Sequence, residues 1–521
     1  PSRISGLQNA CTFCILCFGT PLVKIPMDEL PLFSRVGNYG EKVAISNTTS
    51  QFTYKQLLTD SAALASTLLG DEADLEEARI AFLAPGGPEY ATIQWGIWRA
   101  GGVITPLCLS AAEPEFEYSI TDSEASRVIA TREQATKVAS VCERLEIPLL
   151  VLEDLQLVSE KSLPMLEPSR RAMILYTSGT TSKPKGVVTT HGNIQAQIES
   201  LIEAWEWQAS DRVPLFLPLH HVHGIINVLS CALWMGASIE TFSKFECGSI
   251  FRRVAEDAYT VFMAVPTIYV KLIEALEDSD YQERSKVVKG FNKMRLMVSG
   301  SAALPASVHV KWTELTGQKL LERYGMTEIG MTLSNPFHGE RRPGSVGQAL
   351  PLVEVRLKAE SGELVTVENE PGEIQVRGPC VFDEYWNRPE TTKESFDDGW
   401  FRTGDMAVLE TGYYRIMGRL SVDIIKSGGY KLSALEIEAV LLQHPKIREC
   451  AVIGHLDDTW GEVVAAAVVL EAGSNLDLEH LRDWCRDRLS HYKLPKRLLA
   501  VDALPRNAMG KVTKPAVKDL F

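Results

Sequence analysis

Long apolar runs are scarce in this sequence, and none of them is long enough to cross a bilayer. The longest nearly apolar stretch, Ala10–Val23, is interrupted by two threonines, a glycine and a proline. It falls short of the ~20 apolar residues that a spanning helix needs, so we predict no transmembrane segment. Cysteine is also scarce, since ten residues in 521 are too few for a disulfide scaffold at this length.

Positive charge is scarce relative to negative charge. The chain has 53 Lys and Arg against 67 Asp and Glu, a net charge of −14. An acidic surface repels phosphate backbones, so nucleic acids are not expected as partners, although one local basic pocket for a small anion remains compatible. Apolar residues at 45% and charged residues at 23% exclude a mostly disordered, collagenous or coiled-coil chain. Nothing in the sequence indicates an oligomeric state.

Acidic residues are absent from residues 1–27, which we interpret as a leader. Arg3 and Lys24 without any acid favour an organelle transit peptide, whereas the short apolar centre Ala10–Phe18 favours a secretory signal. A Cys-x-x-Cys-x-x-Cys spacing within it could hold a metal ion. No histidine or fourth cysteine lies nearby, so an unstructured leader is the favoured interpretation.

Along the rest of the chain, the pattern of apolar and polar residues changes twice. Up to about residue 340, short β-branched runs alternate with helical patterns, which is typical of largely parallel α/β sheets. After Pro343 the pattern alternates with a period of two, and Thr411-Gly412 marks a hairpin. A compact α+β pattern follows. We therefore predict an N-terminal domain over residues 28–418 and a C-terminal domain over residues 419–521.

One segment, residues 176–187, has the composition of a polyphosphate cradle. Gly179 allows a close backbone approach, hydroxyl side chains surround it, and Lys183 and Lys185 supply positive charge. The spacing differs from that of the Walker loop. The alternative is a flexible polar surface turn.

Other segments carry further polar residues beside glycines. Each is weak alone, but their joint order and spacing are very specific. These segments are Arg323–Glu328, Gly399–Asp405, Gly418-Arg419, Ile424–Lys431 and Pro505–Lys511.

Together these motifs resemble the adenylate-forming superfamily, which includes acyl-CoA synthetases, luciferases and peptide-synthetase adenylation domains. The resemblance covers residue 28 to the end. It implies an α/β fold in which a large N-terminal domain has two helix-flanked sheets and a small β-barrel. It also implies a mobile α+β lid as the C-terminal domain.

The resemblance implies ATP, Mg²⁺ and coenzyme A as ligands, and it gives individual residues their expected roles. The expected catalytic residues are Lys511, Thr327 and Glu328, with Glu328 also on the metal. The expected ATP-binding residues are Thr177, Ser178, Gly179, Thr180, Thr181, Lys185, Tyr324, Gly325, Met326, Asp405 and Arg419. Coenzyme A is expected at Ser427, Gly428 and Gly429, and the hinge at Ser421.

Two positions depart from the superfamily pattern. Ser182 stands where most members have glycine, which would strain a positive φ by roughly 1–2 kcal/mol. Ser421 stands where most members carry Asp or Lys. Neither change removes a charged catalytic group, so we expect the chain to be active.

The acid-binding pocket is predicted from two features. His221, within His220-His221-Val-His223, matches a family position that lines the acyl pocket; a zinc site is the alternative, although no carboxylate or cysteine accompanies the histidines. Arg323 would need a partner if buried, and a second carboxylate on the substrate would supply one. Alternatively, Arg323 pairs with Glu322 or points outward.

The segments around Ser299–Leu304, Leu321–Met331 and Ser421–Lys431 are similar to those of malonyl-CoA synthetases, in which serine at the hinge is usual. This similarity implies that Arg323 and Ser301 bind the distal carboxylate of malonate. The expected activity is ATP-dependent ligation of malonate to coenzyme A through malonyl-AMP. The alternative activity is the ligation of methylmalonate, a medium-chain acid or an aryl acid. The expected location is the mitochondrial matrix or the cytoplasm.

Overall fold

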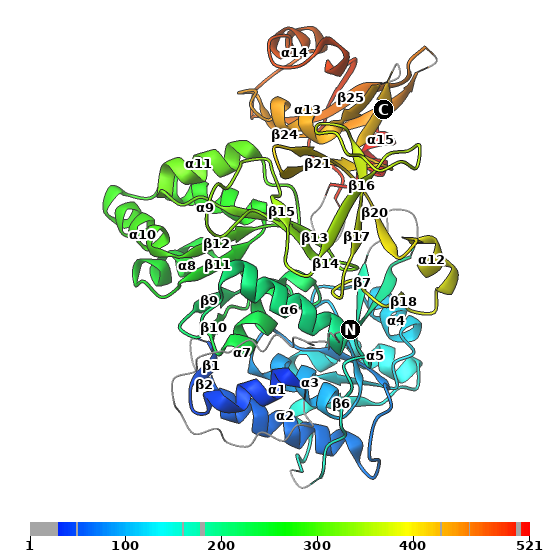
Figure 1. Ribbon diagram of the computed structural model, residues 1–521. Coiled ribbons are helices and arrows are strands. Elements are labelled where there is room, and N and C mark those ends of the chain that lie inside the picture. Colours follow the sequence, from blue (N-terminus) through cyan, green and yellow to red (C-terminus); the bar gives the residue numbers. More distant parts are fainter. Residues whose placement is uncertain are drawn as a thin grey trace, which may run out of the picture.

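The computed structural model describes residues 30–47, 50–158, 161–177, 183–427, 430–457, 459–506 and 512–521. A small C-terminal unit sits at one end of the molecule, above an antiparallel sheet, and the helix-flanked sheets fill the rest (Figure 1). This arrangement confirms the predicted fold class. Among the described residues, no helix has the length and apolarity to span a membrane.

The first large sheet has seven strands in the order β18-β8-β7-β4-β3-β5-β6, and the β4-β3-β5-β6 part is parallel. Its parallel strands are joined by helices, as the alternating sequence pattern predicts. The strands are β3 (Arg79–Leu83), β4 (Val103–Pro106), β5 (Arg127–Ala130), β6 (Leu149–Val151), β7 (Arg171–Thr177), β8 (Lys185–Thr190) and β18 (Glu384–Tyr385). The helices are α3 (Pro88–Arg99), α4 (Glu113–Asp122) and α5 (Arg132–Arg144), with η2 (Leu152–Asp154) after β6.

A four-stranded sheet of order β2-β1-β10-β9 shares one apolar core with the first sheet. Its strands are β1 (Val43–Ser46), β2 (Gln51–Thr53), β9 (Arg212–Leu215) and β10 (Ser238–Thr241). The surrounding helical elements are α1 (Pro31–Val36), η1 (Gly37–Tyr39), α2 (Tyr54–Leu69), α6 (His191–Trp205), the π-helix η3 (His223–Ser230) and α7 (Cys231–Met235).

A further sheet, β11-β12-β13-β14-β15, begins parallel and ends antiparallel. The change of direction falls at the hairpin between β13 and β14, which carries several of the predicted site residues. The strands are β11 (Val261–Ala264), β12 (Leu296–Ser299), β13 (Leu321–Met326), β14 (Gly330–Ser334) and β15 (Gln348–Ala349). The helices are α8 (Cys247–Ala255), α9 (Pro266–Asp278), α10 (Tyr281–Lys293) and α11 (Ala306–Thr316).

The period-two segment after Pro343 forms the predicted β-rich subdomain. Its hairpin closes across Thr411 and Gly412, which both have positive φ, as a tight two-residue turn requires. The strands are β16 (Glu354–Lys358), β17 (Gly372–Arg377), β19 (Phe396–Asp397), β20 (Trp400–Glu410) and β21 (Tyr413–Arg419), with α12 (Pro389–Glu394) beside them.

The C-terminal unit is an antiparallel sheet, β23-β22-β25-β24, with β26 parallel to β25 and its own apolar core. The strands are β22 (Ile424–Ser427), β23 (Tyr430–Ser433), β24 (Ile447–Asp457), β25 (Gly461–Leu470) and β26 (Arg497–Ala500). The helices are α13 (Ala434–Leu441), α14 (Leu478–Cys485), η4 (His491–Lys493) and α15 (Lys514–Lys518).

An ion cluster ties the end of the chain to the turn between β21 and β22. The Lys514 ammonium lies 2.5 Å from Asp423 in that turn and 2.8 Å from Glu438 on α13, and all three side chains are largely buried. Burial lowers the pKa of Lys514, but the two carboxylates outweigh it and the net shift is upward. Lys514 is therefore charged, and it compensates two buried carboxylates.

Replacing Lys514 by methionine is expected to destabilise the C-terminal unit strongly. Removing one partner of a buried ion pair costs about 3–5 kcal/mol, because an uncompensated charge stays behind. Urea unfolding followed by tryptophan fluorescence measures the change. Lys311→Met is the matched control, since its pair with Glu277 is about half exposed (49% and 45%) and is expected to contribute under about 1 kcal/mol. Equal losses in both variants would contradict the prediction.

Candidate active site

The two strands that flank the predicted phosphate loop are antiparallel neighbours. Thr177 at the end of β7 pairs in register with Lys185 at the start of β8. The loop residues for which ATP binding is predicted, Ser178, Gly179, Thr180 and Thr181, lie outside the described residues. So does Ser182, the serine that stands where most of the superfamily has glycine.

Helix α4 holds both ends of this loop. The Tyr118 hydroxyl donates to the Pro184 carbonyl at 2.6 Å, and the Tyr176 hydroxyl donates to Asp122 at 2.9 Å. Asp122 is held in turn by Arg388, at 2.6 Å. The loop therefore leaves from and returns to fixed points, a contribution from α4 that the loop sequence alone does not reveal.

Glu328 lies in the turn between β13 and β14 and is 5% exposed. One carboxylate oxygen accepts a hydrogen bond from the Tyr385 hydroxyl at 2.9 Å, and the other has no hydrogen-bond partner among the described residues. Burial raises the pKa of Glu328, while Tyr385, Arg419 and Lys185 oppose the rise. A buried carboxylate with one free oxygen, close to Lys185, is suited to a cation that accompanies phosphates. The neighbouring Thr327 is half-buried.

A second group joins β13 to the hairpin of β20 and β21. The Tyr324 hydroxyl donates to Asp405 at 2.6 Å, and the Arg419 guanidinium lies 3.3 Å from the other Asp405 oxygen. Asp405 and Arg419 are cross-strand neighbours in register. Burial raises the pKa of Asp405, and Arg419 and Tyr324 oppose it. The structure thus brings together three residues for which nucleotide binding is predicted.

Gly325 and Met326 complete this end of β13. A Cβ at Gly325 would lie 2.1 Å from the Gly330 carbonyl oxygen, so only glycine permits this close hairpin. Met326 pairs with Gly330 in register and is half-buried. Both predicted positions therefore lie in the hairpin that carries Tyr324 and Glu328.

Arg323 is buried, at 3% exposure, and points inward. Its Nη2 lies 3.4 Å from the Ser301 hydroxyl, and its Nε has no hydrogen-bond partner among the described residues. Burial lowers the pKa of Arg323 to about 9, which leaves the guanidinium charged at neutral pH. A Cβ on Gly300 would lie 2.5 Å from the guanidinium carbon, so this glycine makes room for it. Ser301 has a positive φ of 70°, a strained conformation that is found at ligand-binding positions.

The outward-pointing alternative for Arg323 is thereby excluded, and the pairing with Glu322 is not observed. Successive residues of a strand point to opposite faces, and the Glu322 carboxylate accepts from the Leu304 N–H at 2.9 Å instead. That contact holds the segment that follows Ser301.

The histidine that contacts this group is His223, which the sequence prediction named but gave no role. Its Nδ1 lies 3.1 Å from the Ser301 hydroxyl, and its Nε2 is buried without a partner among the described residues. Burial holds the pKa of His223 well below its usual range, with Arg323 and His221 adding to the effect, so the imidazole is neutral. His221 is half-buried, and its ring packs against that of His220 at a tilt of 49°, with the centroids 4.1 Å apart. Its role in the acyl pocket stays a prediction.

The predicted zinc alternative has no support in the described part of the chain. There, no three or more His, Cys, Asp or Glu side chains are grouped to hold a metal ion. Cys11, Cys14 and Cys17 lie outside the described residues.

The predicted lid residues are only partly described. Ser421 is exposed in the turn between β21 and β22, and Ser427 is buried at the end of β22. Gly428, Gly429 and Lys511 lie outside the described residues. Coenzyme A binding, the hinge and the catalytic lysine stay predictions, as do the domain boundaries at residues 27 and 418.

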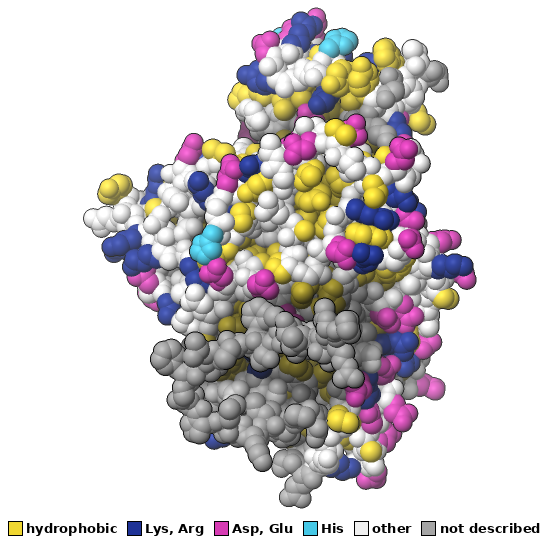
Figure 2. Space-filling view, in the orientation of Figure 1, with side chains coloured by type: hydrophobic (Ala, Val, Ile, Leu, Met, Phe, Trp, Pro, Cys, Tyr) yellow, Lys and Arg dark blue, Asp and Glu magenta, His cyan; other side chains and the backbone are white. Residues whose placement is uncertain are grey.

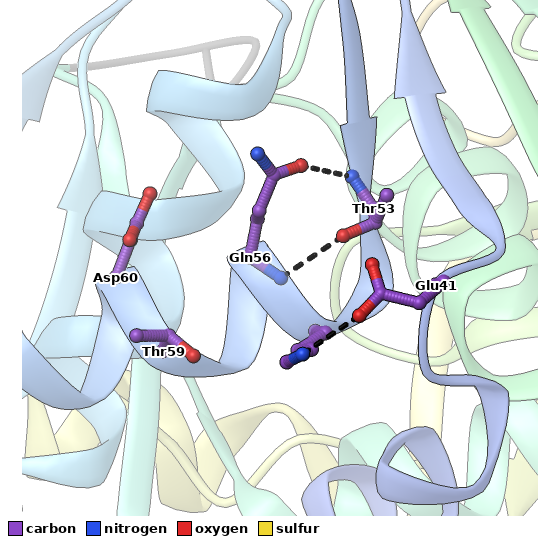
Figure 3. Close-up of a pocket in the computed structure, with 6 residues that line it drawn as sticks. Glu41, Thr53, Gln56, Thr59 and Asp60 are labelled. Atoms are coloured by element: carbon purple, nitrogen blue, oxygen red, sulfur yellow. Dashed lines mark hydrogen bonds and ion pairs between the residues drawn. The ribbon is translucent and has the colours of Figure 1, made fainter.

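A hollow of about 250 Å³ beside the start of α2 is not part of this group (Figure 3). Four of its six lining side chains pair with one another, because Thr53 and Gln56 cap the helix reciprocally and Lys55 pairs with Glu41. Nothing there converges on a ligand.

The chain belongs to the AMP-binding enzyme family. The family's model matches residues 32–386, and that of the AMP-binding enzyme C-terminal domain matches residues 436–511. This confirms the superfamily resemblance that the motifs predict.

Similar proteins include two malonate–CoA ligases. The mitochondrial malonate–CoA ligase ACSF3 of Xenopus laevis is 43% identical, over 93% of this chain and 91% of its own. The malonate–CoA ligase of Arabidopsis thaliana is 40% identical, over 93% of this chain and 87% of its own. Among solved structures, ATP-bound MatB from Rhodopseudomonas palustris superposes with a TM-score of 0.85 at 32% identity, covering 94% of this chain and 98% of that one.

The buried Glu322 gives a prediction for pH-dependent stability. Burial raises the pKa of Glu322 to about 8 against the opposing Leu304 N–H, far above the value of about 4.5 in the unfolded chain. Between these pH values the folded state binds a proton that the unfolded chain releases, so stability falls as pH rises.

Glu322→Gln removes this titration and keeps the acceptor for Leu304. We expect the variant to gain more than about 1 kcal/mol relative to wild type between pH 5 and pH 8. Denaturant unfolding across this pH range measures the gain. The control is Glu314→Gln, at an exposed position on α11. Parallel pH curves for wild type and Glu322→Gln would refute the prediction.

Proposed function

We propose that this chain is an ATP-dependent malonate–CoA ligase that forms malonyl-CoA, AMP and pyrophosphate through malonyl-AMP. The observation that carries the choice of acid is the buried Arg323 guanidinium beside Ser301, with one N–H left without a partner among the described residues. A carboxylate at the far end of a short diacid would satisfy that charge by charge-assisted hydrogen bonds. The names of the two malonate–CoA ligases support the same substrate.

In the proposed first half-reaction, one malonate carboxylate attacks the α-phosphate of ATP and pyrophosphate leaves. Two anions must approach each other, so positioning and charge neutralisation supply most of the catalysis. Thr177, the loop 178–181 and Lys185 would hold the β- and γ-phosphates. Asp405 and Arg419 would hold the ribose, with Tyr324 beside the adenine, and Lys511 would neutralise the reacting carboxylate and α-phosphate.

Mg²⁺ fits the proposed site. The free oxygen of the buried Glu328 is a hard ligand without a hydrogen-bond partner in the described structure, and Mg²⁺ prefers such oxygens together with substrate phosphates. Glu328, with Thr327 beside it, would hold the ion, which supplies neutralisation of phosphate charge when bound.

In the proposed second half-reaction, the coenzyme A thiol attacks the acyl carbonyl of malonyl-AMP and AMP leaves. The segment Ser427–Gly429 would line the path of the pantetheine arm, and rotation near Ser421 would exchange the two lid poses. A lid that closes also protects the mixed anhydride from water. We further propose a mitochondrial location, because the ACSF3 relative has that designation.

Arg323→Ala tests the substrate assignment. Truncating one partner of a buried charged pair costs about 2–5 kcal/mol, so kcat/KM for malonate is expected to fall at least about thirtyfold. Butyrate, which leaves Arg323 unpaired in wild type, is expected to lose little or to gain. The measurement is the malonate-to-butyrate ratio of kcat/KM, from pyrophosphate release.

Arg323→Lys is the matched variant, because it keeps the charge without the planar fork and is expected to retain part of the preference. Thermal melts of each variant control for misfolding. An unchanged ratio in Arg323→Ala would remove the main physical reason for choosing malonate as the substrate.

Lys511→Ala tests the lid assignment. Adenylation, followed by malonate-dependent ATP–pyrophosphate exchange, is expected to fall about a hundredfold or more, because the charge on the reacting groups is no longer neutralised. Thiolysis of supplied malonyl-AMP is expected to stay close to wild type, since the lid has rotated by then. Lys518→Ala, an exposed lysine near the same end, is the control. Equal loss in both half-reactions would contradict the lid role.

A further inference from the structure

Tyr385 contacts two of the residues that the proposed function places on ATP and its metal. Its hydroxyl donates to Glu328 Oε1 at 2.9 Å, and the Lys185 ammonium lies over its ring, 4.8 Å from the centroid. Tyr385 itself is 5% exposed. The roles implied by the family motifs do not include this tyrosine.

Strand pairing explains why these residues meet. β18 adds to the edge of β8, with Tyr385 opposite Val187. Lys185 and Val187 are two residues apart and therefore share a face of β8, so Lys185 lies diagonally across from Tyr385. The Phe382 N–H donates to the Glu328 carbonyl at 2.7 Å, which fixes the turn of Glu328 against the same segment.

The surroundings leave the tyrosine little freedom. Its ring packs on Phe382, with centroids 4.7 Å apart, inside an apolar cluster of the β-rich subdomain. A buried hydroxyl must find an acceptor, and the Tyr385 hydroxyl donates to Glu328. The hydrogen bond therefore fixes one carboxylate oxygen and leaves the orphaned Oε2 as the oxygen available to a ligand.

The Tyr385 ring also contacts the Lys185 ammonium. A cation over an aromatic face is attracted by the ring quadrupole, most strongly where water is excluded. One side chain therefore contacts both the Lys185 ammonium and the Glu328 carboxylate, which brings the two groups to the same side chain. That arrangement suits a magnesium–phosphate unit, which needs an anionic ligand for the metal and a cationic ligand for the phosphate.

We propose that Tyr385 is a positioning residue for the magnesium–ATP complex, aligning Glu328 with its hydroxyl and Lys185 with its ring. This inference rests on the proposed function. It assigns the hydroxyl to the metal side of the site and the ring to the phosphate side.

Two substitutions at Tyr385 distinguish the role of the hydroxyl from the role of the ring. Tyr385→Phe removes the hydroxyl and keeps the ring, whereas Tyr385→Leu removes both. Tyr413→Phe is the matched control, because its hydroxyl donates to the Glu340 carbonyl near the surface, at 3.1 Å.

Binding is measured by isothermal titration of ATP at a series of Mg²⁺ concentrations and with EDTA. For Tyr385→Phe we expect the Mg²⁺ concentration at half-maximal ATP binding to rise about tenfold, with Mg²⁺-free ATP affinity unchanged. For Tyr385→Leu we expect the same rise and, in addition, a loss of Mg²⁺-free affinity of about threefold. In steady state, the KM for ATP of Tyr385→Phe should recover at saturating Mg²⁺.

Several results would overturn the inference. One is a Tyr385→Phe variant with the wild-type Mg²⁺ dependence. Another is a loss of ATP affinity that is equal with and without Mg²⁺, which would indicate a structural role only. Thermal melts identify a variant that fails to fold, and Tyr385→Phe keeps the packing if Tyr385→Leu does not fold. A wild-type protein that binds no magnesium–ATP would overturn the proposed function itself.

Discussion

The burial of ionisable side chains along one short hairpin is the constraint on which the site depends. Glu322, Arg323 and Glu328 are each at most 5% exposed, and each has an orphaned polar atom in the described structure. Leaving such groups unpaired is costly. The fold bears this cost where β13 and β14 turn back on each other, which is where a charged ligand would relieve it.

Close backbone approaches make this hairpin possible. Gly325 meets the Gly330 carbonyl, and a Cβ on Gly330 would overlap Gln197 of α6. Gly300, on the neighbouring segment, leaves room for the Arg323 guanidinium. At each of these glycines, a neighbouring group of the hairpin, of α6 or of Arg323 occupies the space that a side chain would fill. These glycines are therefore fixed by packing around the site.

The sequence predicted the fold class and the family resemblance, because these depend on local pattern and on motif spacing, but it left open whether Arg323 is buried or points outward. It did not predict the partners of the site residues. Nothing in the sequence relates Tyr385 to Glu328 or Asp122 to Tyr176, since those contacts depend on an edge-strand pairing and on a helix about 55 residues upstream. The role of His223 was missed for the same reason.

The turn between β21 and β22 links the strand that carries Arg419 to the C-terminal unit, the proposed lid. The Asp423 carboxylate accepts the Arg419 N–H at 2.9 Å across this turn and also pairs with Lys514. A Cβ on Gly418 would lie 2.3 Å from that of Asp423, so the turn closes tightly.

Ser421 lies between Arg419 and Asp423, so a rotation at Ser421 would break the hydrogen bond between these two residues. The ion pairs of Lys514 with Asp423 and Glu438 both lie on the C-terminal side of Ser421. The buried ion cluster would therefore move as one body with the segment that bears Lys511, and the backbone of Arg419 would stay with Asp405. The proposed hinge at Ser421 would thus separate the residues proposed to hold the nucleotide from the segment proposed to carry the catalytic lysine, and its rotation would break the two hydrogen bonds between the Arg419 backbone and Asp423.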